Sequence, residues 1–119
     1  MLTWQGLADN FIMPNGTMEY YDRVGSTLGT SPQDFYRAFF APGVGHCGGG
    51  MGVLPDDILG ALRTWVEHGV VPDTLAATSQ WNPDGIVRKQ NLCPYPMVNK
   101  YKGSGDPSVA ANYLCADGF

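Results

Sequence analysis

The stretch that decides the fold is Phe35–Gly50, "FYRAFFAPGVGHCGGG". Its first seven residues are aromatic or apolar apart from Arg37, which predicts a strand covered on both faces, as in a parallel sheet. Residues 42–50 predict a loop, because glycine loses too much backbone entropy inside a helix or strand. This loop carries one titratable side chain, His46, with Cys47 directly beside it.

The elements before this stretch predict the first half of an α/β unit. Residues 2–7 predict a short strand, residues 14–16 a turn, and residues 17–28 a helix that Gly29 ends. The apolar face of that helix consists of Met18, Tyr21, Val24 and Leu28.

The elements after the glycine loop predict a helix and a hairpin. Pro55 is predicted to open the second helix, with Asp56 and Asp57 at its positive end, and Gly69 to cap it. Asn82–Gly85 predict a hairpin turn between two short strands. The apolar stripe of the helix consists of Ile58, Leu62, Trp65 and Val66. The order strand, helix, strand, helix, hairpin indicates an α/β fold with a mostly parallel sheet.

The length and the net charge of the chain limit the kinds of molecule that it is expected to bind. The chain has 119 residues, enough for one small domain, and a formal net charge of −4. Without a basic cluster, we expect no binding to nucleic acid or to an anionic membrane. No apolar run approaches the roughly 20 residues that cross a bilayer, and the first ten residues lack the features of a signal peptide.

The three cysteines divide into a pair and a remainder. Cys93 and Cys115 flank a segment rich in Pro, Gly, Tyr and Asn, predicted to be mostly loop with a short helical piece at residues 107–114. A disulfide would constrain such a segment and would favour an oxidising compartment. The alternative is two unpaired thiols in the cytosol. Cys47 is left without a partner in either case.

Asp9 and His46 each follow a predicted strand. In sheets of this type, catalytic groups gather at the carboxyl ends of the strands, and an aspartate that orients a histidine is the acid and base part of a Ser-His-Asp triad. The alternative is that Asp9 is a turn residue and His46 an ordinary surface residue. A serine in a G-x-S-x-G elbow is absent, and Ser104, the one glycine-flanked serine, lacks a flanking strand and helix.

Two other kinds of site have little support. A metal site would need more ligands than His46 and Cys47 with the spacing that zinc sites show, so we expect no metal. The glycine loop lacks the Lys-Ser/Thr of a phosphate-binding loop and has no dinucleotide fingerprint.

Four blocks together resemble the C-terminal part of the tannase and feruloyl esterase family, in the same order and over nearly the whole chain. They are "GLADNFIMPNGTMEYYDRV", "FFAPGVGHCGGG", "WVEHGVVPDTLAAT" and "LCPYPMVNKYKGSGD…ANYLC", of which "PGVGHCGGG" is the most specific. The family consists of secreted serine esterases with an α/β-hydrolase domain and an inserted lid.

The resemblance implies roles for individual residues. The family's catalytic aspartate, after W-x-G-x-A, matches Asp9, and its catalytic histidine matches His46. The cysteine after that histidine, which the family bonds to a cysteine beside the nucleophilic serine, matches Cys47. The family's last disulfide matches Cys93 with Cys115. Leu7 and Asn10 depart from the family's usual Trp before and Pro after "AD", which bears on the packing of the loop and not on its charge.

Residues 1–119 are thus expected to be a single partial catalytic domain of an esterase for phenolic esters. The serine elbow, the lid and the lid's calcium site would belong to a missing N-terminal part of a secreted protein, so no cofactor is expected in this chain. Phe11 and Ile12 are candidates for substrate contacts, and Asn15 for glycosylation or helix capping together with Thr17. The alternative is a non-catalytic remnant that acts at most as a binding or structural module.

Overall fold

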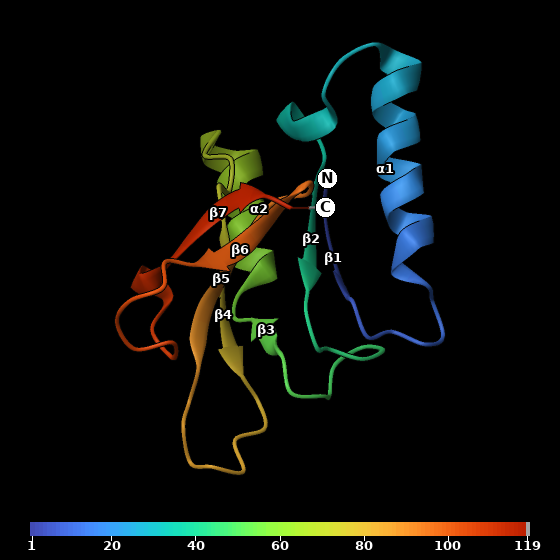
Figure 1. The fold of residues 1–119 in the computed structure, drawn as a ribbon. Coiled ribbons are helices and arrows are strands. Elements are labelled where there is room, and N and C mark those ends of the chain that lie inside the picture. Colours follow the sequence, from blue (N-terminus) through green and yellow to red (C-terminus); the bar gives the residue numbers. More distant parts are fainter. Residues whose placement is uncertain (119) are drawn as a thin grey trace.

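The computed structural model describes residues 1–118 (Figure 1). The strands are β1 (Leu2–Gly6), β2 (Arg37–Ala41), β3 (Val53–Pro55), β4 (Leu75–Ser79), β5 (Lys89–Leu92), β6 (Met97–Tyr101) and β7 (Tyr113–Asp117). The helices are α1 (Pro14–Leu28) and α2 (Ile58–His68), with short 3-10 turns at Pro32–Asp34 and Ala110–Asn112. β1, α1, β2, α2 and the β4–β5 hairpin follow the predicted order, whereas β3 and the β6–β7 pair were not predicted.

β1 and β2 form a parallel pair connected through α1, as predicted. The register runs from Leu2 opposite Arg37 to Gly6 opposite Ala41, so the two strands end side by side. This arrangement brings the loops that follow the two strands to the same edge of the sheet.

β2 is buried on both faces, which confirms the prediction from its unbroken apolar sequence. Phe39 and Ala41 belong to one hydrophobic cluster, against which Ala61 of α2 packs. Ala38 and Phe40 belong to a second cluster, which includes Tyr21 of α1. The alternation of side chains along a strand therefore distributes β2 between two cores, one next to each helix.

The prediction of a mostly parallel sheet is confirmed only in part, because β1–β2 is the only parallel pair among the described strands. β3, β4 and β5 form an antiparallel sheet, and β6 and β7 form a second antiparallel pair. The hairpin turn that includes Asn82–Gly85 joins β4 to β5, and so short a connection requires antiparallel strands. The hairpin itself was predicted correctly.

Both helices begin at positions other than those predicted. Pro14 occupies the first turn of α1, where its missing N–H costs nothing, so residues 14–16 are helical. Pro55 instead ends β3, and Asp57 caps α2 by accepting a hydrogen bond from the N–H of Gly60. Gly69 ends α2 in the left-handed conformation, as predicted. Val66 does not belong to a buried stripe, because it is 76% exposed.

The segment between Cys93 and Cys115 was predicted to be mostly loop but forms the β6–β7 pair. Cys115 lies opposite Asn99 in the register, and the rings of Tyr101 and Tyr113 are 5.3 Å apart across the strands. The predicted helical piece is limited to the turn at 110–112. The predicted disulfide is present: Cys93 and Cys115 are bonded, with their Cα atoms 5.7 Å apart.

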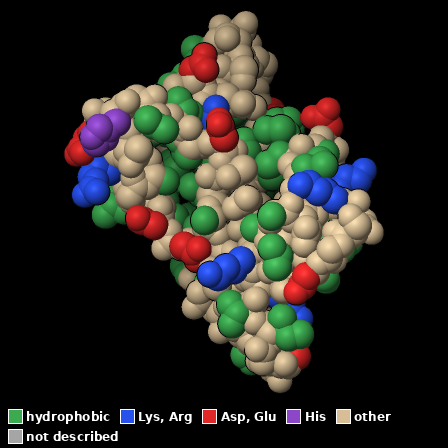
Figure 2. Space-filling view, turned by 90° about the vertical axis from the view of Figure 1, so that its left-hand side faces the viewer, with side chains coloured by type: hydrophobic (Ala, Val, Ile, Leu, Met, Phe, Trp, Pro, Cys, Tyr) green, Lys and Arg blue, Asp and Glu red, His purple; other side chains and the backbone are tan. Residues whose placement is uncertain are grey.

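The surface is mixed in character. Figure 2 shows one face, on which hydrophobic side chains are exposed among scattered acidic and basic ones. Neither α1 nor α2 is long and apolar enough to cross a membrane, and residues 1–118 contain no other α-helix.

The disulfide generates a stability prediction. Closing a loop of about this length is expected to contribute about 3 kcal/mol, because it restricts the unfolded chain. We expect the double variant Cys93→Ala/Cys115→Ala to unfold at a clearly lower denaturant concentration than the wild type, as measured by equilibrium unfolding. An unchanged midpoint would show that the bridge restrains nothing that the β6–β7 pairing does not already hold.

Candidate active site

Asp9 and His46 come together at the carboxyl ends of β1 and β2. Nδ1 of His46 lies 3.0 Å from Oδ2 of Asp9. The Asp9 side chain is 5% exposed, whereas that of His46 is 42% exposed. A buried carboxylate therefore holds one nitrogen of an accessible imidazole, and an imidazole held in this way has a defined tautomer when neutral and is stabilised when protonated.

The backbone brings the two loops into contact. The N–H of Leu7 donates to the carbonyl of Ala41, and the N–H of Ala8 donates to that of Val44, each over 2.9 Å. Gly6 is required for this approach, because a Cβ at that position would lie 2.1 Å from the carbonyl oxygen of Val44. The glycine of the "WQG" sequence thus allows the histidine loop to pass directly over the end of β1.

Backbone hydrogen bonds fix the carboxylate of Asp9. Its Oδ1 accepts from the N–H groups of Phe11 and Ile12, both over 2.9 Å, which leaves Oδ2 for His46. Burial by itself raises the pKa of Asp9. The hydrogen bonds from Ile12, His46 and Phe11, together with the charge on His46, outweigh it and lower the pKa to about 2. Asp9 is therefore ionised at neutral pH.

The histidine loop is anchored on both sides of His46. The Val44 side chain is fully buried in the first core cluster, and Val44 forms a β-bridge with Gly50. Cys47 has a φ of 56°, the only positive value at a non-glycine residue within residues 1–118. Such a conformation is uncommon for a residue with a Cβ, and it occurs here directly after the imidazole.

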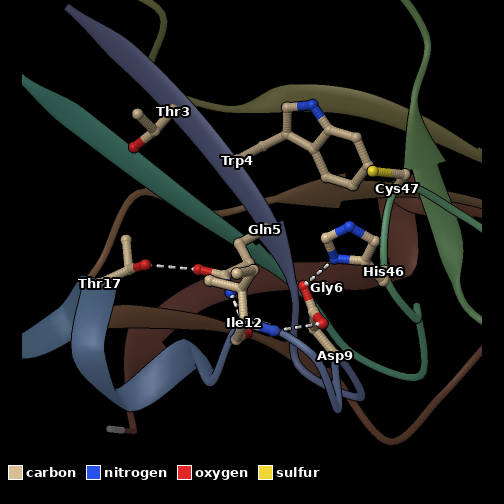
Figure 3. Close-up of a pocket in the computed structure, with 9 residues that line it drawn as sticks. All are labelled: Thr3, Trp4, Gln5, Gly6, Asp9, Ile12, Thr17, His46 and Cys47. Carbon is tan, nitrogen blue, oxygen red and sulfur yellow. Dashed lines mark hydrogen bonds and ion pairs between the residues drawn. The ribbon is translucent and has the colours of Figure 1, made fainter.

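A pocket of about 390 Å³ lies beside this pair. Figure 3 shows Trp4 and Cys47 on one side of His46, and Gln5 and Thr17 across from it; the second ring nitrogen points away from Asp9. The residues that line the pocket are Thr3, Trp4, Gln5, Gly6, Asp9, Ile12, Thr17, His46 and Cys47. Trp4, Gln5 and Thr17 were not predicted from the sequence to line a pocket. The alternation of side chains along β1 could have placed Trp4 and Gln5 on opposite faces of the strand.

The two predicted substrate-contact residues differ in their placement. Ile12 lines the pocket and is 57% exposed. Phe11 lies next to it with its ring edge-on to His46, at 5.5 Å between ring centres, and is 74% exposed. Phe11 is thus not a core residue, and both side chains are accessible from the side of the imidazole.

Asn15 is exposed in the first turn of α1 and does not cap the helix. Thr17 does not cap it either, because its hydroxyl donates to Oε1 of Gln5 over 2.5 Å. The capping alternative is therefore wrong, whereas glycosylation of Asn15 stays a prediction.

Two further expectations concern groups that would complete the site. The pocket lining contains no serine among the described residues, so Ser104 is not placed there. Residues 1–118 contain no cluster of three or more His, Cys, Asp or Glu side chains that could hold a metal ion. The side chains described here therefore do not fit the calcium ion that the family resemblance implies for a lid.

Known proteins resemble the chain over its whole length. It is 42% identical, over 100% of its residues, to a probable feruloyl esterase of Arthroderma benhamiae. It is 40% identical, over 98%, to a mono(2-hydroxyethyl) terephthalate hydrolase of Piscinibacter sakaiensis. The chain spans 23% and 19% of the lengths of these two relatives. The crystal structure of an esterase from Aspergillus oryzae superposes with a TM-score of 0.86 at 32% identity, covering 97% of this chain and 27% of that one.

The family comparison covers nearly every residue of the chain. The sequence model of the family described as tannase and feruloyl esterase matches residues 1–116, which include the loops that carry Asp9 and His46. The chain therefore belongs to the tannase and feruloyl esterase family, a family of ester hydrolases.

Proposed function

We propose that this chain supplies the acid and base of a Ser-His-Asp site that hydrolyses esters of phenolic acids. The observation that carries the proposal is the contact between His46 and the buried, ionised Asp9, beside an open pocket. The nucleophilic serine belongs to a part of the whole protein outside these 119 residues.

The proposed mechanism uses only proton transfer and acyl transfer. The second nitrogen of His46 accepts the proton of the serine hydroxyl while the serine oxygen attacks the ester carbonyl. His46 then gives that proton to the departing alcohol, and an acyl-serine remains. Water attacks the acyl-serine with His46 again as base, which releases the phenolic acid and restores the serine. Asp9 keeps its negative charge throughout and stabilises the imidazolium. No cofactor takes part.

The fold supports a serine that comes from elsewhere in the protein. Within residues 1–118, β1 is hydrogen-bonded as a strand on one side only, to β2. The pocket follows Thr3–Gly6 of this strand, so it borders the unpaired side. A further strand that pairs with β1 in parallel would bring its own carboxyl end toward His46. The exposed apolar residues Leu59 and Val66 of α2 offer surface that the rest of the protein would cover.

Cys47 supplies a covalent link in this proposal. It is exposed and is not disulfide-bonded within residues 1–118. Its place directly after His46 suits a bridge to a cysteine beside the serine, which would hold base and nucleophile together. The Cys93–Cys115 disulfide supports an oxidising, extracellular location of the protein.

Loss of the base or the acid should abolish hydrolysis in the whole protein. We expect Asp9→Asn to lower kcat for a feruloyl ester by about 10⁴-fold and His46→Ala by about 10⁶-fold, because the imidazole loses its partner or is removed. His68→Ala is the matched control, since His68 is exposed in the last turn of α2, and it should retain full activity. If the His46→Ala variant hydrolysed the ester as fast as the wild type does, His46 would not be the base, and the non-catalytic alternative would be favoured.

The low pKa of Asp9 predicts how its contribution to stability depends on pH. The folded value of about 2 lies below the ordinary 3.8, so ionised Asp9 stabilises the fold above pH 3.8 and loses this effect as pH falls toward 2. Asp9→Asn should therefore lower Tm at pH 7, and the difference from the wild type should shrink between pH 3.8 and 2. Thermal unfolding at several pH values measures this; a difference that does not change with pH would contradict the prediction.

The state of Cys47 can be measured directly. We expect peptide mapping of the unreduced whole protein to find Cys47 joined to a cysteine adjacent to a serine, and to find the Cys93–Cys115 peptide separately. Alkylation of Cys47 without prior reduction would refute the proposed link, whereas it would leave the pairing of Asp9 with His46 unaffected.

A further inference from the structure

We propose that Gln5 is a positioning residue, whose side-chain amide fastens the loop that holds Asp9 against His46. This inference rests on the proposed function of that pair. Gln5 lies on β1 and is not part of the triad, but it keeps the carboxylate of Asp9 in place.

The loop of residues 9–13 depends on polar contacts for its position, because its apolar side chains do not pack against the core. Phe11, Ile12 and Met13 are 74%, 57% and 63% exposed, so little apolar burial holds this segment to the core. Yet the N–H groups of Phe11 and Ile12 are the ones that fix Oδ1 of Asp9. Any movement of this backbone would move the carboxylate with it.

Gln5 reaches this backbone from β1, across the turn that precedes α1. Its Nε2 donates to the carbonyl oxygen of Ile12 over 2.6 Å, and its Oε1 accepts from the hydroxyl of Thr17 over 2.5 Å. Gln5 and Thr17 are both half-buried, on β1 and α1 respectively. One amide therefore connects a strand, a helix and the exposed loop between them, as Figure 3 shows.

The contacts form a continuous chain that ends at the base. Thr17 orients the amide of Gln5, Gln5 holds Ile12, the N–H of Ile12 binds Asp9, and Asp9 binds His46. Because a small displacement of a catalytic group can cost about 10²-fold in rate, this chain should affect kcat. It should leave KM nearly unchanged, because both hydrogen-bonding atoms of Gln5 already have protein partners.

The test replaces Gln5, in the whole protein, by a side chain of similar size that has no amide and cannot donate a hydrogen bond. We expect Gln5→Met to lower kcat about 10- to 100-fold with KM within twofold of wild type. Thr17→Val, which keeps Gln5 but removes its partner, should lower kcat by a smaller factor. Gln90→Met is the matched control: Gln90 is a half-buried glutamine on β5, and it should retain wild-type kcat.

A second measurement is independent of hydrolysis. Amide hydrogen exchange of Phe11 and Ile12 should become at least tenfold faster in Gln5→Met, and should not change in Gln90→Met. Protection equal to wild type, a kcat within twofold of wild type, or a loss confined to KM would each overturn the role of Gln5. An inactive wild type would refute the proposed esterase function, whereas the exchange measurement would still decide whether Gln5 holds the loop.

Discussion

The parallel pairing of β1 with β2 is the interaction on which the rest of the site depends. It brings Gly6 opposite Ala41, and therefore makes the two following loops start side by side. The hydrogen bonds from Leu7 and Ala8 then extend this contact beyond the strands. The pairing requires α1 as a crossover, because parallel neighbours cannot be joined by a tight turn. One local arrangement thus accounts both for the fold of residues 1–41 and for the meeting of Asp9 with His46.

The two catalytic candidates are held by different means. The histidine loop is fixed by burial and close backbone packing: Val44 lies in the core, and Gly6 accommodates the loop above it. The aspartate loop has exposed side chains and is fixed by polar contacts instead, at the carboxylate of Asp9 and at the amide of Gln5. An apolar anchor is insensitive to the charge of the site. The hydrogen bonds at the carboxylate of Asp9 depend on its ionisation, which they also favour.

The larger departures from the expected fold lie after the site, whereas those before it are limited to the ends of strands and helices, as in α1 and β2. Residues 97–101 and 113–117 contain polar residues among apolar ones, and the Gly- and Pro-containing turn between them suggested a loop. Their pairing depends on contacts between the strands, such as Tyr101 with Tyr113, and on the disulfide at Cys115. The start of α2 was misplaced because a proline followed by two aspartates suits a helix start, whereas Pro55 ends β3 and Asp57 caps a helix that begins at Ile58. These differences leave the carboxyl ends of β1 and β2 unaffected.

The sequence by itself determined the features that depend on residue type and local spacing. These are the buried strand, predicted at 35–41 and found at 37–41, the glycine loop with His46, the Gly69 cap and the cysteine pair. Four blocks of sequence, of which "PGVGHCGGG" is the most specific, indicated the family. Only the tertiary structure decided which side chains meet. It brought Asp9 within 3.0 Å of His46, placed Gln5 against Ile12 and Thr17, and exposed Phe11 beside the imidazole. The physical reason is that strand and helix periodicities are local. A contact across 37 residues instead depends on the register of two strands and on how closely their loops can approach.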